Sequence, residues 1–280
     1  MHVVVCIKQV PDSAQIRVHP VTNTIMRQGV PTIINPYDLF ALEEALRLKD
    51  TLGATVTVLT MGPPTAADSL RKALTFGADR AVLLTDRYFA GSDTLATSFA
   101  LSMALRKIAE DFGKPEIIFT GKQTIDGDTA QVGPGIAKRL EYNQLTYISR
   151  IVECDLAGGM IKVERRAEGG LQVLETRLPV LITMLEATNE MRRGSIENAL
   201  SAARAEVVTW NAAAVGIEDL TKCGLRGSPT IVKKVFAPTA RSEKAVMIDA
   251  DGTVDGRAAA LVEGIFVRAP SVEQDLLEHA

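Results

Sequence analysis

A glycine-rich loop, GKQTIDGDTAQVGPG (Gly121–Gly135), has the residue types best suited to binding a charged ligand. The apolar stretch Glu116–Thr120 before it predicts a buried strand, and Ile136–Leu140 after it predicts the start of a helix. Unpaired backbone N–H groups and the helix dipole attract anions at such a point, and a nucleotide diphosphate is a suitable anion. The loop matches neither G-x-G-x-x-G nor G-x-x-x-x-G-K-[ST], so it predicts a nucleotide site of another geometry.

The sequence leaves two features of this loop open. Its glycines either form a plain flexible connection or let a ligand approach the backbone, with Thr129 and Gln131 supplying side-chain hydrogen bonds. Pro134 lies either in the first turn of the following helix or at a kink in a helix that begins at Asp128. Acidic residues flank Gly127, but the remaining spacing of a calcium loop is missing, so we predict no metal site.

The titratable side chains predict no covalent or acid–base catalyst. The histidines are far apart and are expected to be solvated: His2, His19 and His279. Cys6 ends an apolar strand and is expected to be a small buried residue that could lie beside a ligand. The three cysteines are widely spaced, which favours a reducing compartment over a disulfide framework or a zinc site.

Composition excludes several classes of partner. The chain has 280 residues, 46% hydrophobic and 23% charged, with a formal net charge of -3 and a pI near 5.8. It has no basic run, so binding to nucleic acid or to an anionic membrane is not expected. No apolar run reaches the roughly 18 residues that a membrane helix needs, and no basic leader opens the chain. We expect a cytoplasmic protein without direct membrane insertion.

Alternating strands and helices should position the loop. Strands are predicted over 3–7, 55–60, 81–85 and 116–120, and helices over 66–76, over 94–112 and from a cap at Asp38 to a stop at Gly53. The near-continuous apolar strands predict an α/β protein with a doubly wound, mostly parallel sheet. The loops at the carboxyl ends of its strands should then meet at one site.

The second half of the chain shows a different pattern. We predict an antiparallel hairpin of strands 161–165 and 171–177. A strand over 180–185 should return to the sheet, and a helix is predicted over 196–205. From Pro238 large apolar residues are few, which predicts an arm that needs something else to pack against, with a closing helix over 258–265. The predicted domains are a nucleotide-binding α/β domain, 1–236, and a C-terminal arm, 237–280.

Several separated segments follow one another in a characteristic order: VVVCIKQVPD (3–12), NPYD (35–38), TMGPP (60–64), SDTLATS (92–98), GKQTIDGDTAQVGP (121–134), ERRAEGG (164–170) and NEMRRGSIENAL (189–200). Together they resemble the beta subunit of electron transfer flavoproteins over about residues 1–236. The resemblance implies an adenine-nucleotide-hydrolase-like sheet and an alpha/beta heterodimer whose alpha subunit receives the C-terminal arm. An ATP-binding regulator of the universal-stress type is a weaker alternative, because it lacks the arm and the hairpin.

The loop also resembles one branch of this family. Ordinary members hold AMP as a structural filler, whereas electron-bifurcating members hold a second FAD, and IDGDTAQVGP (125–134) is similar to the bifurcating type. That resemblance implies an FAD that accepts hydride from NADH and splits the electrons between ferredoxin or flavodoxin and the alpha-subunit FAD. The alternative is a non-bifurcating subunit that holds AMP and passes electrons between dehydrogenases and a quinone reductase.

Carried over by resemblance, the cofactor site comprises three groups of residues. The adenosine and ribitol side would be surrounded by Cys6, Lys8, Asn35, Tyr37, Asp38, Met61 and Gly62. The diphosphate would lie within Gly121–Gly133, which includes Gln123, Asp126, Gly127, Asp128, Thr129, Gln131, Val132 and Gly133. Thr94 would approach the flavin ring. None of these residues is implied to be a catalyst, because the flavin performs the redox chemistry.

Asn189–Leu200 resembles the family's recognition loop, which docks on a partner dehydrogenase. The implied partner-binding residues are Asn189, Glu190, Arg192 and Ile196. Ile196 stands where ordinary members place a leucine anchor, whereas Met191 departs from the proline of their Asn-Glu-Pro-Arg run. The alternative is an ordinary capped amphipathic helix.

Overall fold

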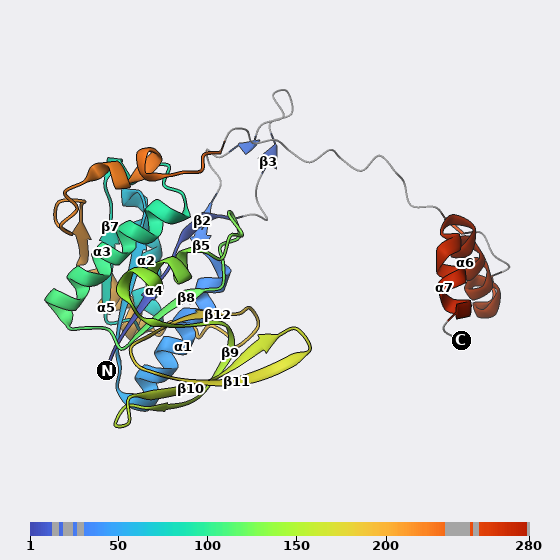
Figure 1. The fold of residues 1–280 in the computed structure, drawn as a ribbon, viewed down its shortest axis with the longest axis horizontal. Helices are drawn as coiled ribbons and strands as arrows, with labels where there is room; N and C mark the ends of the chain where they lie inside the picture. Colours follow the sequence, from blue (N-terminus) through green and yellow to red (C-terminus); the bar gives the residue numbers. More distant parts are fainter. Residues whose placement is uncertain (13–16, 19–24, 27–30, 233–246, 249–251, 279–280) are drawn as a thin grey trace. The chain divides into compact units, whose positions relative to one another are not determined.

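The computed structural model describes residues 1–12, 17–18, 25–26, 31–232, 247–248 and 252–278. The chain divides into two compact units, Met1–Phe236 and Ala237–Ala280 (Figure 1). Each unit has its own secondary structure, and the predicted site residues all lie in the first one.

A nine-stranded sheet forms the centre of the described part of the first unit, in the order β11-β10-β9-β12-β8-β1-β6-β7-β13. Neighbouring strands from β13 to β9 are parallel, and β10 pairs antiparallel with both β9 and β11. The parallel strands are β1 (His2–Cys6), β6 (Thr55–Met61), β7 (Arg80–Leu84), β8 (Ile117–Gly121), β12 (Val180–Met184), β13 (Val207–Trp210) and β9 (Asn143–Asp155). The antiparallel extension adds β10 (Met160–Ala167) and β11 (Gly170–Arg177).

Helices cover both faces of this sheet (Figure 1). Alternate residues of β1 show the division, because Val3 and Val5 pack in one core cluster and Val4 and Cys6 pack in the other. The first cluster includes α1 (Pro36–Leu52), α2 (Ala67–Phe76) and α5 (Ile196–Arg204), and the second includes α3 (Thr94–Phe112) and α4 (Val132–Leu140). The predicted doubly wound α/β fold is therefore confirmed, as are the hairpin and the returning strand.

Two sequence predictions about local structure were wrong in detail, and strand β9 was missed. Asp38 does not cap α1, because the helix begins at Pro36 after Asn35, and a proline at the start fixes a helical φ. The helix after the glycine-rich loop begins at Val132 instead of Ile136, so Pro134 lies in its first turn. β9 was not predicted, because bulges break its alternation of buried and exposed residues, and Tyr147 has a φ of 61°.

His2 is buried, contrary to the expectation that it is solvated. Its Nδ1 lies 2.7 Å from the carbonyl oxygen of Gly113, which requires Nδ1 to donate, and its Nε2 lies 2.9 Å from Thr57 Oγ1. Arg80 donates to the same hydroxyl over 3.3 Å. Burial lowers the pKa of His2, so these contacts hold a neutral ring. His19 and His279 lie outside the described residues.

Two small ladders follow β1, one between β2 (Gln9–Pro11) and β5 (Thr32–Ile34) and one between β3 (Arg17–Val18) and β4 (Ile25–Met26).

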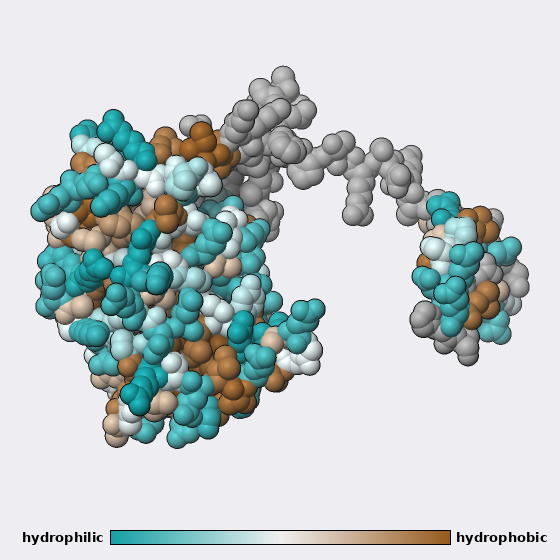
Figure 2. All heavy atoms as spheres, viewed as in Figure 1, coloured by the Kyte–Doolittle hydropathy of each residue, from teal (hydrophilic) through white to brown (hydrophobic). Residues whose placement is uncertain are grey.

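The second unit contains α6 (Val254–Arg268) and α7 (Pro270–Glu278). The closing helix predicted over 258–265 is therefore part of a longer helix, α6, and a second helix follows it. Several of its apolar side chains are exposed, and Figure 2 shows apolar surface on this unit. Within the described ranges, no helix has both the length and the apolarity to cross a bilayer.

Candidate functional site

A cavity of about 1480 Å³ lies at the carboxyl ends of β1, β6, β7 and β8. Its walls come from the loops that follow these four strands, as expected for a parallel sheet. The predicted site residues that line it are Cys6, Lys8, Asp38, Met61, Gly62, Thr94, Gly121, Gln123, Asp126, Gly127, Thr129, Gln131, Val132 and Gly133. Asn35, Tyr37 and Asp128 are not among the lining residues.

Asn35 and Asp38, at the start of α1, hold the backbone of the glycine-rich loop. The Asn35 amide donates to Gln123 O over 2.9 Å and accepts from Ile125 N over 3.2 Å. Asp38 accepts from the backbone N–H groups of Lys8 at 2.8 Å and Gly121 at 3.1 Å. Both side chains are buried, so they shape the loop from behind. Burial raises the pKa of Asp38 to about 7, although these hydrogen bonds oppose the shift.

Side chains also tie the outer part of the loop. Lys8 Nζ contacts both carboxylate oxygens of Asp126, at 2.8 and 2.7 Å, and joins the β1–β2 turn to the loop. Partial burial raises the pKa of Asp126, but hydrogen bonds from Lys8 and Thr124 outweigh it and lower the pKa. Gln123 Nε2 donates to Asp128 Oδ1 over 2.7 Å. Lys8 is therefore a cation at the cavity whose charge Asp126 balances.

The glycines of the loop have different roles. A Cβ at Gly121 would lie 2.5 Å from Asp38 Oδ1, and one at Gly133 would lie 2.9 Å from Thr120 Oγ1, so close packing requires both glycines. A Cβ at Gly127 would meet only Thr124 Oγ1, at 3.4 Å. The strained backbone of this loop lies instead at Asp128 and Ala130, whose φ values are 53° and 55°.

Two helices begin at the cavity. Asp93 caps α3 by accepting from Leu95 N and Ala96 N. The side chain of Gln131 does not cap α4; its Oε1 accepts a hydrogen bond from Thr94 Oγ1 over 2.8 Å. The first turn of α4 therefore offers N–H groups without an intrahelical acceptor beside residues that line the cavity. This helix end suits a bound anion.

Sequence reasoning missed one wall of the cavity. Pro229, Thr230 and Val232 line it, although they follow α3 by more than a hundred positions and belong to no motif. The segment Thr85–Gly91 lines it as well. No sequence signal indicated this wall. In the structure Asp93, just before α3, accepts hydrogen bonds from Thr230 N and Thr230 Oγ1 and so connects the wall to that helix.

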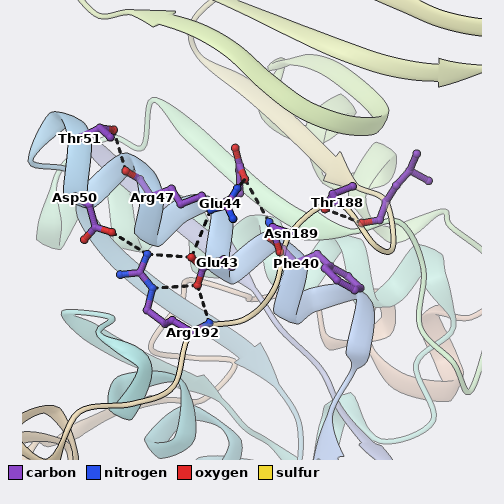
Figure 3. Close-up of polar contacts among 10 residues, drawn as sticks. Phe40, Glu43, Glu44, Arg47, Asp50, Thr51, Thr188, Asn189 and Arg192 are labelled. Carbon is purple, nitrogen blue, oxygen red and sulfur yellow. Dashed lines mark hydrogen bonds and ion pairs between the residues drawn. The ribbon is translucent and has the colours of Figure 1, made fainter.

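The predicted recognition loop divides into anchored and exposed residues (Figure 3). Arg192 Nε and Nη2 donate to the two oxygens of the buried Glu43, each over 3.0 Å, and Nη2 also contacts Asp50 at 2.8 Å. Asn189 Nδ2 donates to the carbonyl oxygen of Phe40 over 3.0 Å. Arg192 and Asn189 therefore fasten the loop to α1.

The exposed residues continue into α5. Ser195 caps this helix by accepting from Asn198 N over 3.0 Å. Ile196 is 82% exposed and Leu200 is 56% exposed, one helical turn apart, and Glu190 is also exposed. Of the predicted partner-binding residues, Glu190 and Ile196 are therefore exposed, and Leu200 extends the apolar surface of Ile196.

A mostly parallel sheet, a large cavity at its carboxyl edge and a helix start beside a glycine-rich loop form the arrangement in which α/β proteins commonly bind ligands. The family model described as "Electron transfer flavoprotein domain" matches residues 22–215. The chain therefore belongs to the electron transfer flavoprotein family, and the resemblance found in its sequence is confirmed at that level.

Relatives place it among the beta-type subunits. "Protein FixA" of Azorhizobium caulinodans is 74% identical over 276 residues, which cover 99% of this chain and 98% of that protein. "Protein FixA" of Azotobacter vinelandii is 64% identical over 281 residues, 100% of each chain. "Electron transfer flavoprotein subunit beta" of Clostridium acetobutylicum is 49% identical over 234 residues, 84% of this chain and 87% of that protein.

Proposed function

We propose that this chain is the beta subunit of an electron-bifurcating flavoprotein heterodimer and that its cavity binds FAD. The observation that carries the proposal is the size of the cavity. Its volume of about 1480 Å³ exceeds the range of about 300–1000 Å³ in which drug-sized ligands bind, so it has room for a dinucleotide.

The residues around the cavity fit the parts of such a ligand. The start of α4 and the loop 121–133 would hold the diphosphate through backbone N–H groups, with Lys8 nearby as a hydrogen-bond donor whose charge Asp126 balances. Cys6, Met61 and Gly62 would contact the adenosine and ribitol side, and Thr94 would contact the flavin. When bound, FAD would supply hydride acceptance from NADH and electron transfer to ferredoxin or flavodoxin and to the alpha-subunit FAD.

The surface features support roles for two protein partners. In the second unit, the apolar side chains of α6 and α7 are exposed, among them Leu261, Ile265 and Leu277, which suits packing on an alpha subunit. On α5, Ile196 and Leu200 form an apolar contact for a dehydrogenase or quinone reductase. The Arg192–Glu43 ion pair would keep that helix in place before docking.

An anaerobic titration of the purified heterodimer with NADH tests this function. We expect NADH to bleach the absorbance of more than one flavin per heterodimer when no electron acceptor is present. A heterodimer in which NADH reduces no flavin would contradict bifurcation. It would favour the alternative, a non-bifurcating carrier that holds AMP in this cavity.

A further inference from the structure

The segment Gly224–Val232, called here the strap, lies beside the start of α3 and lines the cavity through Pro229, Thr230 and Val232. Beyond the 3₁₀ helix Gly224–Gly227 it has no regular structure up to Val232. Ile231 is 70% exposed and Val232 is 82% exposed, so little apolar burial holds this part in position. Its placement must depend on specific polar contacts.

Asp93 makes the contacts that hold the strap. Its Oδ2 accepts from the backbone N–H of Thr230 over 3.2 Å and from Thr230 Oγ1 over 2.9 Å. Its backbone N–H donates to Ser228 Oγ over 2.8 Å, and that hydroxyl donates to Gly224 O over 2.6 Å. The other carboxylate oxygen, Oδ1, caps α3 by accepting from Leu95 N and Ala96 N.

Close packing fixes the first part of the strap independently of Asp93. Gly224 N donates to Ser92 Oγ over 3.1 Å. Gly224 has a φ of +58° and approaches the carbonyl oxygen of Tyr88 so closely that a Cβ would clash. The part that depends on Asp93 is therefore Ser228–Val232, which is also the part that lines the cavity.

We propose that Asp93 is a positioning residue that holds Ser228–Val232 as a wall of the cavity, and that this wall retains the bound nucleotide. The inference rests on the proposed nucleotide site. One carboxylate thereby joins the start of a helix at the cavity to a segment more than a hundred residues away. Loss of the strap contact opens one side of the cavity and leaves the diphosphate loop 121–133 intact.

The substitution Asp93→Asn separates the two roles of this side chain. Asparagine caps helices as well as aspartate, so the contacts of Oδ1 remain. The amide nitrogen that replaces Oδ2 cannot accept from Thr230 N–H and can only donate to the Thr230 hydroxyl, so the contact that holds the strap is weakened. Thr230→Val removes one of these donors, whereas Thr230→Ser keeps both.

The experiment uses the heterodimer purified with its native nucleotide and measures the rate at which FAD or AMP dissociates into charcoal. We expect Asp93→Asn to accelerate dissociation about fivefold, and Thr230→Val to have a smaller effect, with little change in Tm. Thr230→Ser should dissociate like the wild type. Asp219→Asn is the matched control, since Asp219 caps a 3₁₀ helix and does not line the cavity.

The outcomes distinguish the two proposals. If Asp93→Asn and Thr230→Val release the nucleotide at the wild-type rate, the role of Asp93 is wrong and the nucleotide site stands. If the wild-type heterodimer carries no adenine nucleotide beyond that of its alpha subunit, the proposed function itself is wrong. If Asp93→Asn does not fold, the Thr230→Val and Thr230→Ser pair decides, and equal rates for these two variants would overturn the inference.

Discussion

Two loops of the first unit are fastened to the same helix, α1, by opposite arrangements. In the glycine-rich loop, Asn35 and Asp38 of the α1 region bind the loop's backbone. Its side chains Asp126 and Gln131 line the cavity, where they pair with Lys8 and Thr94 and not with α1. In the recognition loop, the side chains of Asn189 and Arg192 are themselves the anchors. A loop anchored through its backbone can present its own side chains to a ligand. A loop anchored through its side chains must rely on neighbouring residues.

This comparison changes the interpretation of the second loop. Arg192 and Asn189 were predicted to contact a partner, yet both bind α1 within this chain (Figure 3). The exposed turn of α5 with Ile196 and Leu200 is the surface they hold in place. We therefore expect partner binding to depend on Ile196 directly and on Arg192 through the position of the loop.

Removing the backbone anchor of the first loop should have the largest effect. Asn35→Ala leaves the partly buried backbone groups of Gln123 and Ile125 without their partner, which should cost about 2 kcal/mol of unfolding free energy, and it empties a buried side-chain position. The variant should also lose its nucleotide. Urea denaturation and nucleotide content measure the two effects. The matched control is Asn143→Ala, since Asn143 donates from an exposed position; equal losses in both variants would contradict the anchoring role.

Removing the side-chain anchor of the second loop should have a somewhat smaller effect. Arg192→Ala leaves the buried Glu43 carboxylate without its main cation, which should cost about 2 kcal/mol. Nucleotide content should stay at the wild-type level, and docking of the partner should weaken. Arg193→Ala, at the exposed neighbouring position, is the control. Loss of nucleotide from Arg192→Ala would show that the two loops are not independent.

A substitution at Gly127 tests the open part of the first loop. The backbone there has room for a side chain, so Gly127→Asp should fold with a Tm close to that of the wild type. Its negative charge near the diphosphate should weaken nucleotide binding about tenfold. Gly127→Ala controls for size alone. Unchanged affinity in Gly127→Asp would place the diphosphate elsewhere in the cavity.

The pH dependence of stability should report on His2, which is remote from both loops. Burial lowers the pKa of His2 below its ordinary value of 6.5. As the pH falls below 6.5, the unfolded chain therefore binds a proton before the folded chain does, and stability is lost at up to about 1.4 kcal/mol per pH unit until the folded pKa is reached. His2→Gln should remove this contribution. Denaturation between pH 7 and pH 5 measures it, and parallel pH profiles for the two proteins would refute the assignment.

The sequence predicted those parts of the fold that depend on local patterns. Apolar runs identified the parallel strands β1, β6, β7, β8 and β12 but missed β9 and β13, and the helix predicted over 94–112 matches α3. Contacts between residues far apart in the sequence could not be predicted from local patterns. Arg192 meets Glu43 across 149 positions, Thr230 meets Asp93 across 137, and His2 meets Gly113 across 111. Nothing in the neighbouring sequence of these polar residues indicates a partner, because the partner comes near only when the sheet is assembled.

The glycines show the same limit within one loop. All were open to the same interpretation from sequence, because glycine permits both close packing and ligand approach. The structure separates Gly121 and Gly133, which pack against Asp38 and Thr120, from Gly127, where a Cβ would make only an ordinary contact with Thr124. Composition identified the loop, whereas the role of each glycine depends on atoms supplied by other elements.

The identity of the nucleotide tests the central claim most directly. The heterodimer of this chain with its alpha subunit would be denatured, and the released nucleotides would be identified by mass spectrometry and counted by absorbance. We predict two FAD molecules per heterodimer. One FAD together with one AMP would contradict the claim that the cavity at the carboxyl ends of β1, β6, β7 and β8 holds a flavin.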